Sequence, residues 1–321
     1  MKKYTHGWIA LSAIKRLEKI VPQLKQDDQD KAINLIKYLK ENNDGVIQGA
    51  WFPDSVIHDN STGHIWQLRI AKNDEPYLRE PHFLPPSLLG YKKIKKDLKK
   101  LKIFHKQRTV LPDRCQALSY AIRDQLKVTH EVGRKKFGAG SAIVPTNNEV
   151  ALNFFMLSHY VADAHMPLHC DARAFDDEIH GMIESYWEKQ ITTWYKPQGV
   201  KGKDKRFALD ENGYPKLYKT ENFEESMLGK LDEKIKSSEF TKSLGTKNSN
   251  VYDYMVDVCY YSFLLSISII DKEITSSLSV KKFEEAYAPI YEDLAVEFLF
   301  DAIDSTARVW LKSWKDFEDS K

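Results

Sequence analysis

The sequence predicts an all-α protein, and two observations support this fold class. Over most of the chain, apolar residues recur at intervals of three and four residues, which places them along one face of a helix. Few stretches alternate between apolar and polar residues, as the strands of a half-buried sheet do. The helical spacing covers residues 5–20, 28–41, 87–104, 113–132, 147–168, 176–194, 221–238, 250–272 and 281–316.

Local signals place helix starts and one long loop. Asp27 and Asp28 stand at the start of one helical segment and Asp113 at the start of another, and short polar side chains cap helix N-termini. Residues 196–220 are rich in Lys, Gly and Pro, so we interpret them as a long loop, either an insertion near an active-site mouth or a surface loop. We assign residues 1–321 to a single domain, although the length alone would also allow two.

The sequence contains no recognisable targeting signal and has little net charge, so we expect a cytoplasmic enzyme. The formal net charge is only +2. The start Met1-Lys2-Lys3 is basic, but charged residues interrupt the following apolar run from Lys15 onward, and no small-residue cleavage site follows. The longest apolar stretch, residues 258–270, is too short and too polar to cross a membrane. We therefore expect neither a signal peptide nor a membrane span.

Residues 92–106 concentrate positive charge, with eight lysines and one aspartate. Ile94, Leu98 and Leu101 lie at helical spacing within this segment, which predicts a basic amphipathic helix. Such a helix can bind an anionic membrane surface or the phosphates of nucleic acid. A solvated helix face is the commoner explanation of this pattern, and all three interpretations remain open.

The strongest functional signal is a cluster of side chains that commonly bind metals. His159 and Asp163 are four residues apart, and so are His180 and Glu184, so each pair projects from one face of a helix. His169 lies between the two pairs. One pair alone is weak evidence, because a solvated helix face or a buried hydrogen bond also explains it. Two pairs with a third histidine favour a metal site.

Zinc is the metal that these residues favour. The segment around His159 is strongly apolar, which predicts a buried face where an ionised Asp163 needs a compensating cation. Imidazole together with carboxylate suits zinc, whereas calcium and magnesium prefer oxygen ligands. Pro167 removes a backbone hydrogen bond and kinks or ends the helix. His169 therefore need not follow the rotation set by His159 and can face a second metal ion.

Other histidines and cysteines fit the metal site less well. Cys115, Cys170 and Cys259 show no Cys-x-x-Cys spacing, so we expect reduced thiols and neither disulfides nor metal ligands. His165 lies two residues from Asp163 and therefore points to the opposite side of a helix.

Three segments resemble the zinc-dependent phospholipase C family, whose relatives include the fungal single-strand-specific zinc nucleases. The pattern His-Tyr-x-x-Asp-x-x-x-Pro-x-His, followed by His-x-x-x-Glu, resembles the core motif of the family. Near the N-terminus, a second segment resembles the His-x-Trp-Ile of bacterial phospholipases C, and a third resembles the metal-binding Asp and the His that follows it. These two segments are Thr5-His6-Gly7-Trp8-Ile9-Ala10-Leu11 and Gly49-Ala50-Trp51-Phe52-Pro53-Asp54-Ser55, the latter followed by Gly63-His64-Ile65-Trp66.

The resemblance, which is confined to residues 1–190, implies a multi-helix domain of the phospholipase C and zinc nuclease type with a trinuclear zinc site. Asp163 would bridge two of the three ions. The implied ligands are Asp54, His64, His159 and Asp163 for the first zinc, His169, His180 and Glu184 for the second, and His6 with Asp163 for the third.

The third zinc ion is where this sequence departs from the family pattern. The family completes that ion with the amine and carbonyl of an N-terminal Trp, which this sequence lacks. Lys2 disfavours removal of the preceding methionine, so the amine and carbonyl of Met1, five residues before His6, are the candidate ligands. Water ligands or an empty third site are the alternatives. We expect two zinc ions and leave the third open.

The first zinc site also has two candidate histidines. His58 lies four residues after Asp54 and competes with His64, but the longer interval between Asp and His in the family favours His64.

The chemistry that the resemblance implies is hydrolysis of a phosphate ester by a zinc-activated water. Asp54 is the residue implied to orient or deprotonate that water. Glu184 favours a phospholipase C-like activity, because the fungal nucleases usually have Asp there. A cytoplasmic location instead favours a nuclease or nucleotide phosphodiesterase acting on single-stranded nucleic acid or nucleotides.

Aromatic residues near the motifs leave the substrate class open, because they can stack a base, contact a lipid or pack in the core. These residues are Trp51, Phe52, Trp66 and Tyr160. A non-catalytic binding module stabilised by metal is the third hypothesis, and the completeness of the implied ligand set argues against it.

Overall fold

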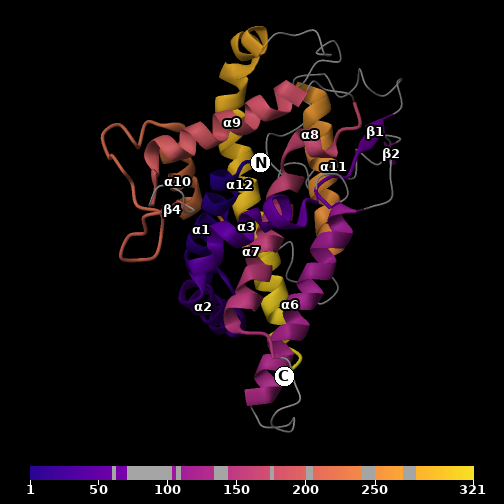
Figure 1. The fold of residues 1–321 in the computed structure, drawn as a ribbon, viewed down its shortest axis with the longest axis vertical. Helices are drawn as coiled ribbons and strands as arrows, with labels where there is room; N and C mark the ends of the chain where they lie inside the picture. The colour runs from indigo at the N-terminus through magenta and orange to yellow at the C-terminus, as the bar shows by residue number, and fades with distance from the viewer. Residues whose placement is uncertain are drawn as a thin grey trace.

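The structure is a computed structural model that describes residues 1–59, 63–70, 103–105, 110–133, 144–173, 177–199, 205–240, 250–269 and 280–321. This part of the chain is mostly helical, as the sequence predicts (Figure 1). The longer helices are α1 (Lys3–Ile20), α2 (Gln26–Glu41), α6 (Leu111–Gly133), α7 (Asn147–Ala164), α9 (Asp177–Trp194), α10 (Met227–Ser237), α11 (Val251–Ile269) and α12 (Val280–Glu318). Shorter helical segments are η1 (Val21–Gln23), η2 (Asn43–Gly45), α3 (Val46–Phe52), η3 (Pro53–Ile57) and α8 (Pro167–Cys170).

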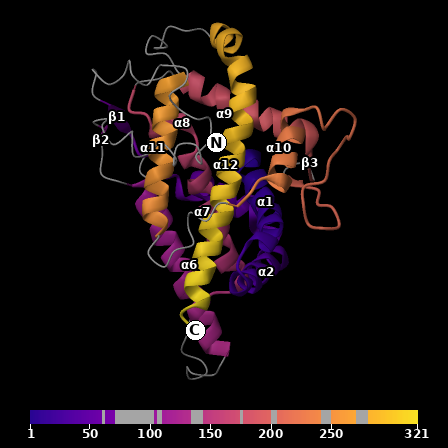
Figure 2. The same cartoon turned by 180° about the vertical axis from the view of Figure 1, so that it is seen from behind.

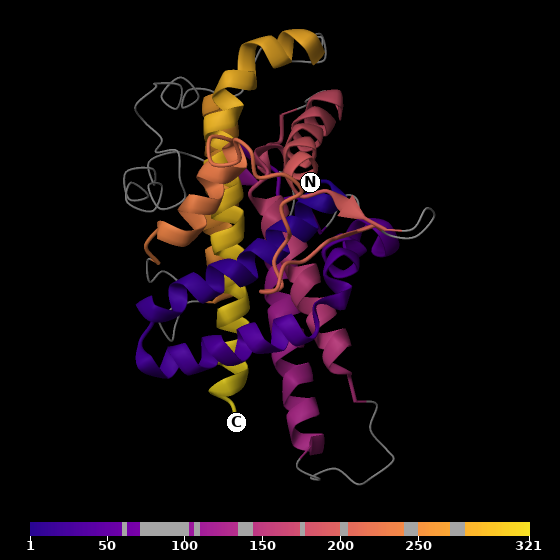
Figure 3. The same ribbon diagram turned by 90° about the vertical axis from the view of Figure 1, so that its left-hand side faces the viewer.

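Helices α1, α7 and α12 form the centre of the molecule. Figure 2 shows α12 running along most of the length of the molecule, and Figure 3 shows α1 and α2 as a hairpin lying across it. Helix α1 contacts α2, α3, α7, α9, α10 and α12. Its buried Arg16 donates to the Asp304 carboxylate of α12 at 2.7 Å and to the carbonyl oxygens of Ile235 and Ser238. A buried guanidinium with these partners has its charge and its donors satisfied.

Both ends of α7 follow from local sequence. Thr146 and Glu149 form a capping box, in which the Thr146 hydroxyl accepts from the Glu149 amide and the Glu149 carboxylate accepts from the Thr146 amide. The helix ends at Ala164, and Met166 is extended because it precedes Pro167. Pro167 then opens α8 as its first residue. The predicted interruption before His169 is confirmed.

Two predicted helices are wrong in part. Residues 103–105 form strand β2 (Ile103–His105), which pairs antiparallel with β1 (Leu68–Ile70), so the predicted helix 87–104 does not reach its expected end. Pairing across strands outweighs the local helical spacing at this point. The rest of that helix, and all of the basic segment 92–106 except β2, lie outside the described residues.

The second correction concerns the predicted helix 221–238. Its first residues form turns, and α10 begins only at Met227. The Ser226 side chain accepts a hydrogen bond from the Gly229 amide at 3.1 Å and so caps the helix at this later point.

The predicted long loop at 196–220 has defined structure in its described part. Strands β3 (Pro197–Gln198) and β4 (Arg206–Phe207) pair within it. Tyr214 is buried beneath the ammonium groups of Lys15 and Lys40, which lie 5.8 and 4.7 Å from its ring centre. This part of the loop therefore packs against α1 and α2.

No described helix combines the length and apolar character needed to cross a membrane. Cys115, Cys170 and Cys259 are buried free thiols, as expected.

Helices α3 and α7 approach closely at Gly49, where a Cβ atom would lie 2.6 Å from the Phe155 Cβ. We predict that Gly49→Ala lowers the free energy of unfolding by about 1–3 kcal/mol, because the added methyl group forces the two helices apart. Gly181 is the matched control, since it also lies inside a helix and a Cβ there meets no atom within 4 Å. Gly181→Ala should raise the free energy of unfolding by up to about 1 kcal/mol. Urea denaturation measures both, and equal effects would contradict the close approach.

Candidate metal centre

The candidate ligands come from four regions of the chain and meet near the first residue. Met1 is buried, and Figure 1 places the N-terminus at the centre of the ribbon, near α8 and α9. Helix α1 contributes His6, the α3–η3 region and the following loop contribute Asp54 and His64, α7 contributes His159 and Asp163, and α8 and α9 contribute His169, His180 and Glu184.

The Asp163 carboxylate is the centre of this arrangement. Its side chain is only 1% exposed. Oδ2 lies 2.7 Å from the His64 Nδ1 and 3.1 Å from the His159 Nε2. Oδ1 lies 2.9 Å from the Met1 amine. The two oxygens thus face different groups of side chains, as a bridging carboxylate does.

The first group consists of Asp54, His64 and His159, joined by Asp163. The Asp54 Oδ1 lies 3.4 Å from the His64 Nε2 and 3.5 Å from the His159 Nε2. Nitrogen donors 2.0–2.1 Å from a tetrahedral zinc lie about 3.3 Å apart. The distances from the Asp54 oxygen to the two ring nitrogens are close to this value.

A hydrogen bond to a backbone carbonyl fixes the orientation of the His159 ring. Its Nδ1 lies 2.7 Å from the carbonyl oxygen of Ala50 in α3. Because a carbonyl oxygen only accepts hydrogen bonds, Nδ1 carries the proton and Nε2 faces Asp163. Hydrogen bonding of the second ring nitrogen in this way is typical of metal-binding histidines.

The second group consists of His169, His180 and Glu184. The His169 and His180 Nε2 atoms are 2.9 Å apart, and the His180 Nε2 lies 2.8 Å from the Glu184 Oε1. His180 and Glu184 lie one turn apart on α9, as their spacing predicts. His169 faces them because α8 is a separate helix from α7.

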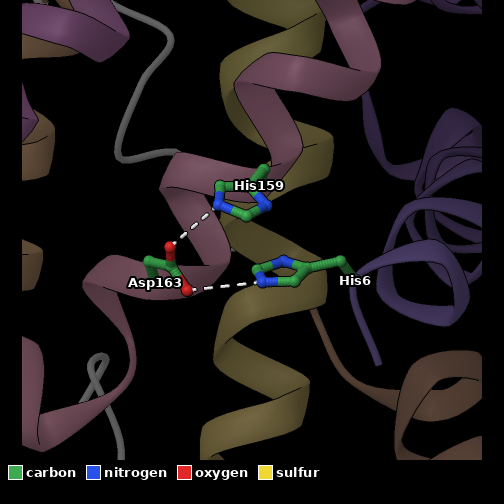
Figure 4. A group of neighbouring side chains, drawn as sticks. All are labelled: His6, His159 and Asp163. Atoms are coloured by element: carbon green, nitrogen blue, oxygen red, sulfur yellow. Dashed lines mark ion pairs between the residues drawn. The ribbon is translucent and has the colours of Figure 1, made fainter. Parts of the chain in front are cut away.

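The third group contains Met1 and His6. The His6 Nε2 lies 3.1 Å from the Met1 carbonyl oxygen and 3.4 Å from the Asp163 Oδ1. The Met1 amine also lies 2.7 Å from Glu184. Figure 4 shows His6 and His159 directed at Asp163, with their rings stacked at a centroid distance of 3.9 Å. His6, His159 and Asp163 form a candidate group themselves, so His159 lies between the first and third groups.

His58 and His165 are not members of these groups. His58 is exposed at the end of η3, and it is His64 that approaches Asp54. His165 ends α7, and its Nε2 lies 2.9 Å from the Ser305 hydroxyl.

The donor atoms fit zinc on two grounds. They are imidazole nitrogens and carboxylate oxygens in closely spaced groups, which is the ligand chemistry of zinc. In the described part of the chain, the buried His64 Nε2 and His169 Nδ1 have no hydrogen-bond partner. They face carboxylate oxygens of Asp54 and Asp163 at 3.4 and 3.7 Å. These separations are too long for good hydrogen bonds and allow a cation between the atoms.

Burial and charge oppose each other throughout the centre. Burial raises the pKa of Asp163, but the Met1 ammonium and His159 outweigh this effect and hold that pKa well below its usual range. Burial lowers the pKa of the Met1 amine, yet Asp163 and Glu184 raise it overall from 8.0 to about 11. Burial likewise lowers the pKa of His159, and Asp163 with Asp54 raises it overall to about 9. Positive charge is thus favoured at the Met1 amine and at His159, whereas at His6 and His169 burial outweighs the carboxylates and holds both pKa values below their usual range.

Seven of the candidate ligands line a cavity of about 520 Å³, namely Met1, Asp54, His64, Asp163, His169, His180 and Glu184. This volume is typical of small-molecule sites. Asp54, with a side chain 25% exposed, is more accessible from the cavity than Asp163. Side chains that complete the lining are Trp51, Ile65, Gln67, Leu168, Asp171 and Arg173.

Glu188 is a carboxylate that holds the N-terminus and that was not singled out from the sequence. Glu188 accepts hydrogen bonds from the amides of Tyr4 and Thr5, at 2.8 and 3.3 Å, and so caps the first turn of α1 from α9. Its position continues the four-residue spacing of His180 and Glu184, which was a usable signal. Nothing in the sequence spacing indicated that Gln67 and Arg173 line the cavity.

Comparisons of the chain with protein-family models, with curated proteins and with solved structures found no match. The resemblance to the zinc-dependent phospholipases C therefore stays a prediction from the motifs.

We predict that zinc binds more tightly as the pH rises. Below their raised pKa values the Met1 amine and His159 carry protons that a metal ion must displace, so acid opposes binding. Each displaced proton contributes about a tenfold change in affinity per pH unit. Competition with a chelator between about pH 6 and about pH 8 measures the slope, after correction for the chelator's own protonation. An affinity independent of pH would contradict the assignment of these two groups as ligands.

We also predict that Asp163→Asn lowers zinc affinity by more than about 100-fold, because it removes the charge shared by the groups. The control is His165→Gln, which alters a buried histidine outside the groups. Zinc content after dialysis distinguishes them, with circular dichroism as the check on folding. If Asp163→Asn and His165→Gln both fold and lose zinc equally, the metal ligands do not project from the face of α7 that carries Asp163.

Proposed function

We propose that this protein is a zinc-dependent hydrolase of phosphate diesters with a phospholipase C-like activity. One observation carries the proposal, namely that three groups of zinc-type ligands lie around one buried carboxylate, Asp163, at the wall of a cavity. Multinuclear metal centres of this kind suit phosphoryl chemistry, because attacking and leaving oxygens both require charge stabilisation.

Zinc bound at these residues would lower the pKa of a coordinated water toward 7 and stabilise negative charge on phosphoryl oxygens. Asp54 would orient that water and accept its proton; in support of this role, its carboxylate belongs to the first group and is accessible from the cavity. The Ala50 carbonyl keeps His159 in the tautomer whose Nε2 faces the centre.

A second cavity supports the choice of a lipid-like substrate. It measures about 410 Å³ and is adjacent to the first, because Trp51 lines both. Four of its seven other lining residues are apolar, the exposed Val56 among them, and Lys3 contributes a charged group. A diester with its phosphate at the metal centre can extend an aliphatic substituent past Trp51 into this groove. The residues of the groove are Lys3, Ile47, Gln48, Trp51, Phe52, Ser55, Val56 and Leu152.

The second candidate function is a nuclease, and Trp51 is the observation that favours it. The Trp51 side chain is partly exposed between the two cavities and can stack a base. Trp66 and Tyr160, by contrast, are buried and line neither cavity. Two of the four aromatic residues singled out from the sequence are therefore core residues.

We predict that the zinc-loaded protein hydrolyses phosphatidylcholine faster than single-stranded DNA, and that a chelator abolishes the activity. Val56→Ser should lower kcat/KM for the lipid roughly tenfold, since burying a valine side chain contributes about 1.5 kcal/mol. Val128→Ser is the control, because Val128 is also exposed but lies on α6 and lines neither cavity.

Three outcomes would count against this function. Faster hydrolysis of DNA would favour the nuclease, and equal effects of the two valine substitutions would exclude the groove as a lipid site. Absence of turnover on both substrates by the zinc-loaded protein would contradict the proposed activity.

A further inference from the structure

Asp54 and His64 are two candidate ligands of the first group, and a short connection joins them in the sequence. Helix η3 ends at Ile57, and His58 adopts the left-handed conformation with φ of 51°. Asp59, which follows, is buried although it carries a charged side chain. A buried carboxylate requires partners, and the partners of Asp59 show what it holds together.

The Asp59 carboxylate joins three parts of the structure. Its Oδ1 accepts a hydrogen bond from the Gly63 amide at 2.9 Å. Its Oδ2 accepts from the Tyr160 hydroxyl of α7 at 2.9 Å and from the Arg114 guanidinium of α6 at 3.2 Å. Gly63, the residue before His64, is thereby linked through Asp59 to the helix that carries His159 and Asp163.

Gly63 approaches the Asp59 carboxylate very closely. A Cβ atom at position 63 would lie 1.8 Å from the Asp59 Oδ2, so only glycine permits the approach. Gly63 directly precedes His64, and the position of Asp59 therefore restricts where the His64 backbone lies.

Tyr160 connects the same carboxylate to the metal-binding rings. It follows His159 on α7 and is completely buried. Its ring centre lies 5.3 Å from that of His64 and 5.5 Å from that of His159. The hydroxyl that binds Asp59 thus belongs to a side chain that packs against both rings.

We propose that Asp59 is a positioning residue that, through Tyr160 and Gly63, sets the approach of His64 to His159 and Asp163 and so determines the affinity of the first metal ion. The proposal rests on the metal binding in our proposed function and is independent of which diester is hydrolysed. Asp59 acts through its neighbours, because its carboxylate oxygens are occupied by the three donors described above.

The test removes two hydroxyls in turn, each of which forms a hydrogen bond at one end of α7. Tyr160→Phe breaks the bond to Asp59 and keeps the ring, whereas Tyr38→Phe removes a hydroxyl that donates to the Asn147 carbonyl at the start of α7, far along the helix from His159. Cobalt(II) is the probe, since its visible absorption reports ligand geometry at a zinc-type site. Asp59→Asn is a second variant that retains shape and removes charge.

Tyr160→Phe and Asp59→Asn should each weaken binding of the first cobalt ion by about tenfold or more and change its absorption spectrum, as loss of residues behind metal ligands does. Binding at His169, His180 and Glu184 should be unchanged, and Tyr38→Phe should bind as the wild type does. Thermal unfolding shows whether the tyrosine variants lose similar stability.

Wild-type cobalt affinity and spectrum in both Tyr160→Phe and Asp59→Asn would overturn the proposal. Equal weakening by Tyr38→Phe would also overturn it, because the effect would then reflect stability alone. Position-specific weakening in a protein that hydrolyses no diester would support the role of Asp59 and contradict the proposed function. A wild-type chain that binds no cobalt would overturn both.

Discussion

The burial of the Asp163 carboxylate is the constraint on which the rest of this structure depends. An ionised carboxylate that is 1% exposed would be strongly unfavourable without nearby positive charge. The Met1 amine, His64 and His159 lie within 3.1 Å of its oxygens. Regions as distant in sequence as residues 1 and 163 therefore have to meet at one point, and the fold has to bring them there.

The helices are arranged to satisfy this requirement. Helix α7 supplies the carboxylate and, through its close contact with α3 at Gly49, lies against the segment that leads to Asp54. Glu188 caps α1 from α9 and so holds the N-terminal residues beside Glu184. Asp59 likewise holds Gly63, and with it the backbone at His64, through a hydrogen bond. The first and third groups are thus held by a carboxylate or a carbonyl outside them.

The sequence was sufficient for most of the described helices and for the proximity of the two candidate pairs, because both depend on short-range spacing. His159 with Asp163 and His180 with Glu184 are read directly from a four-residue interval, and the break at Pro167 follows from the chemistry of proline. The contacts of Glu188 with α1 and of Asp59 with α6 and α7 depend on tertiary packing, and so does the strand at 103–105. No local pattern encodes such partners, because each involves residues far apart in the chain.

Anomalous X-ray diffraction at the zinc absorption edge, from crystals of protein purified without added metal, tests the central claim most directly. The account predicts one peak among Asp54, His64, His159 and the Asp163 Oδ2, and another among His169, His180 and Glu184, each at about 2.0–2.2 Å from its ligands. An additional peak beside the Met1 amine and His6 would show the third ion. Absence of any zinc within coordination distance of Asp163, in crystals that had also been soaked in zinc, would contradict the account.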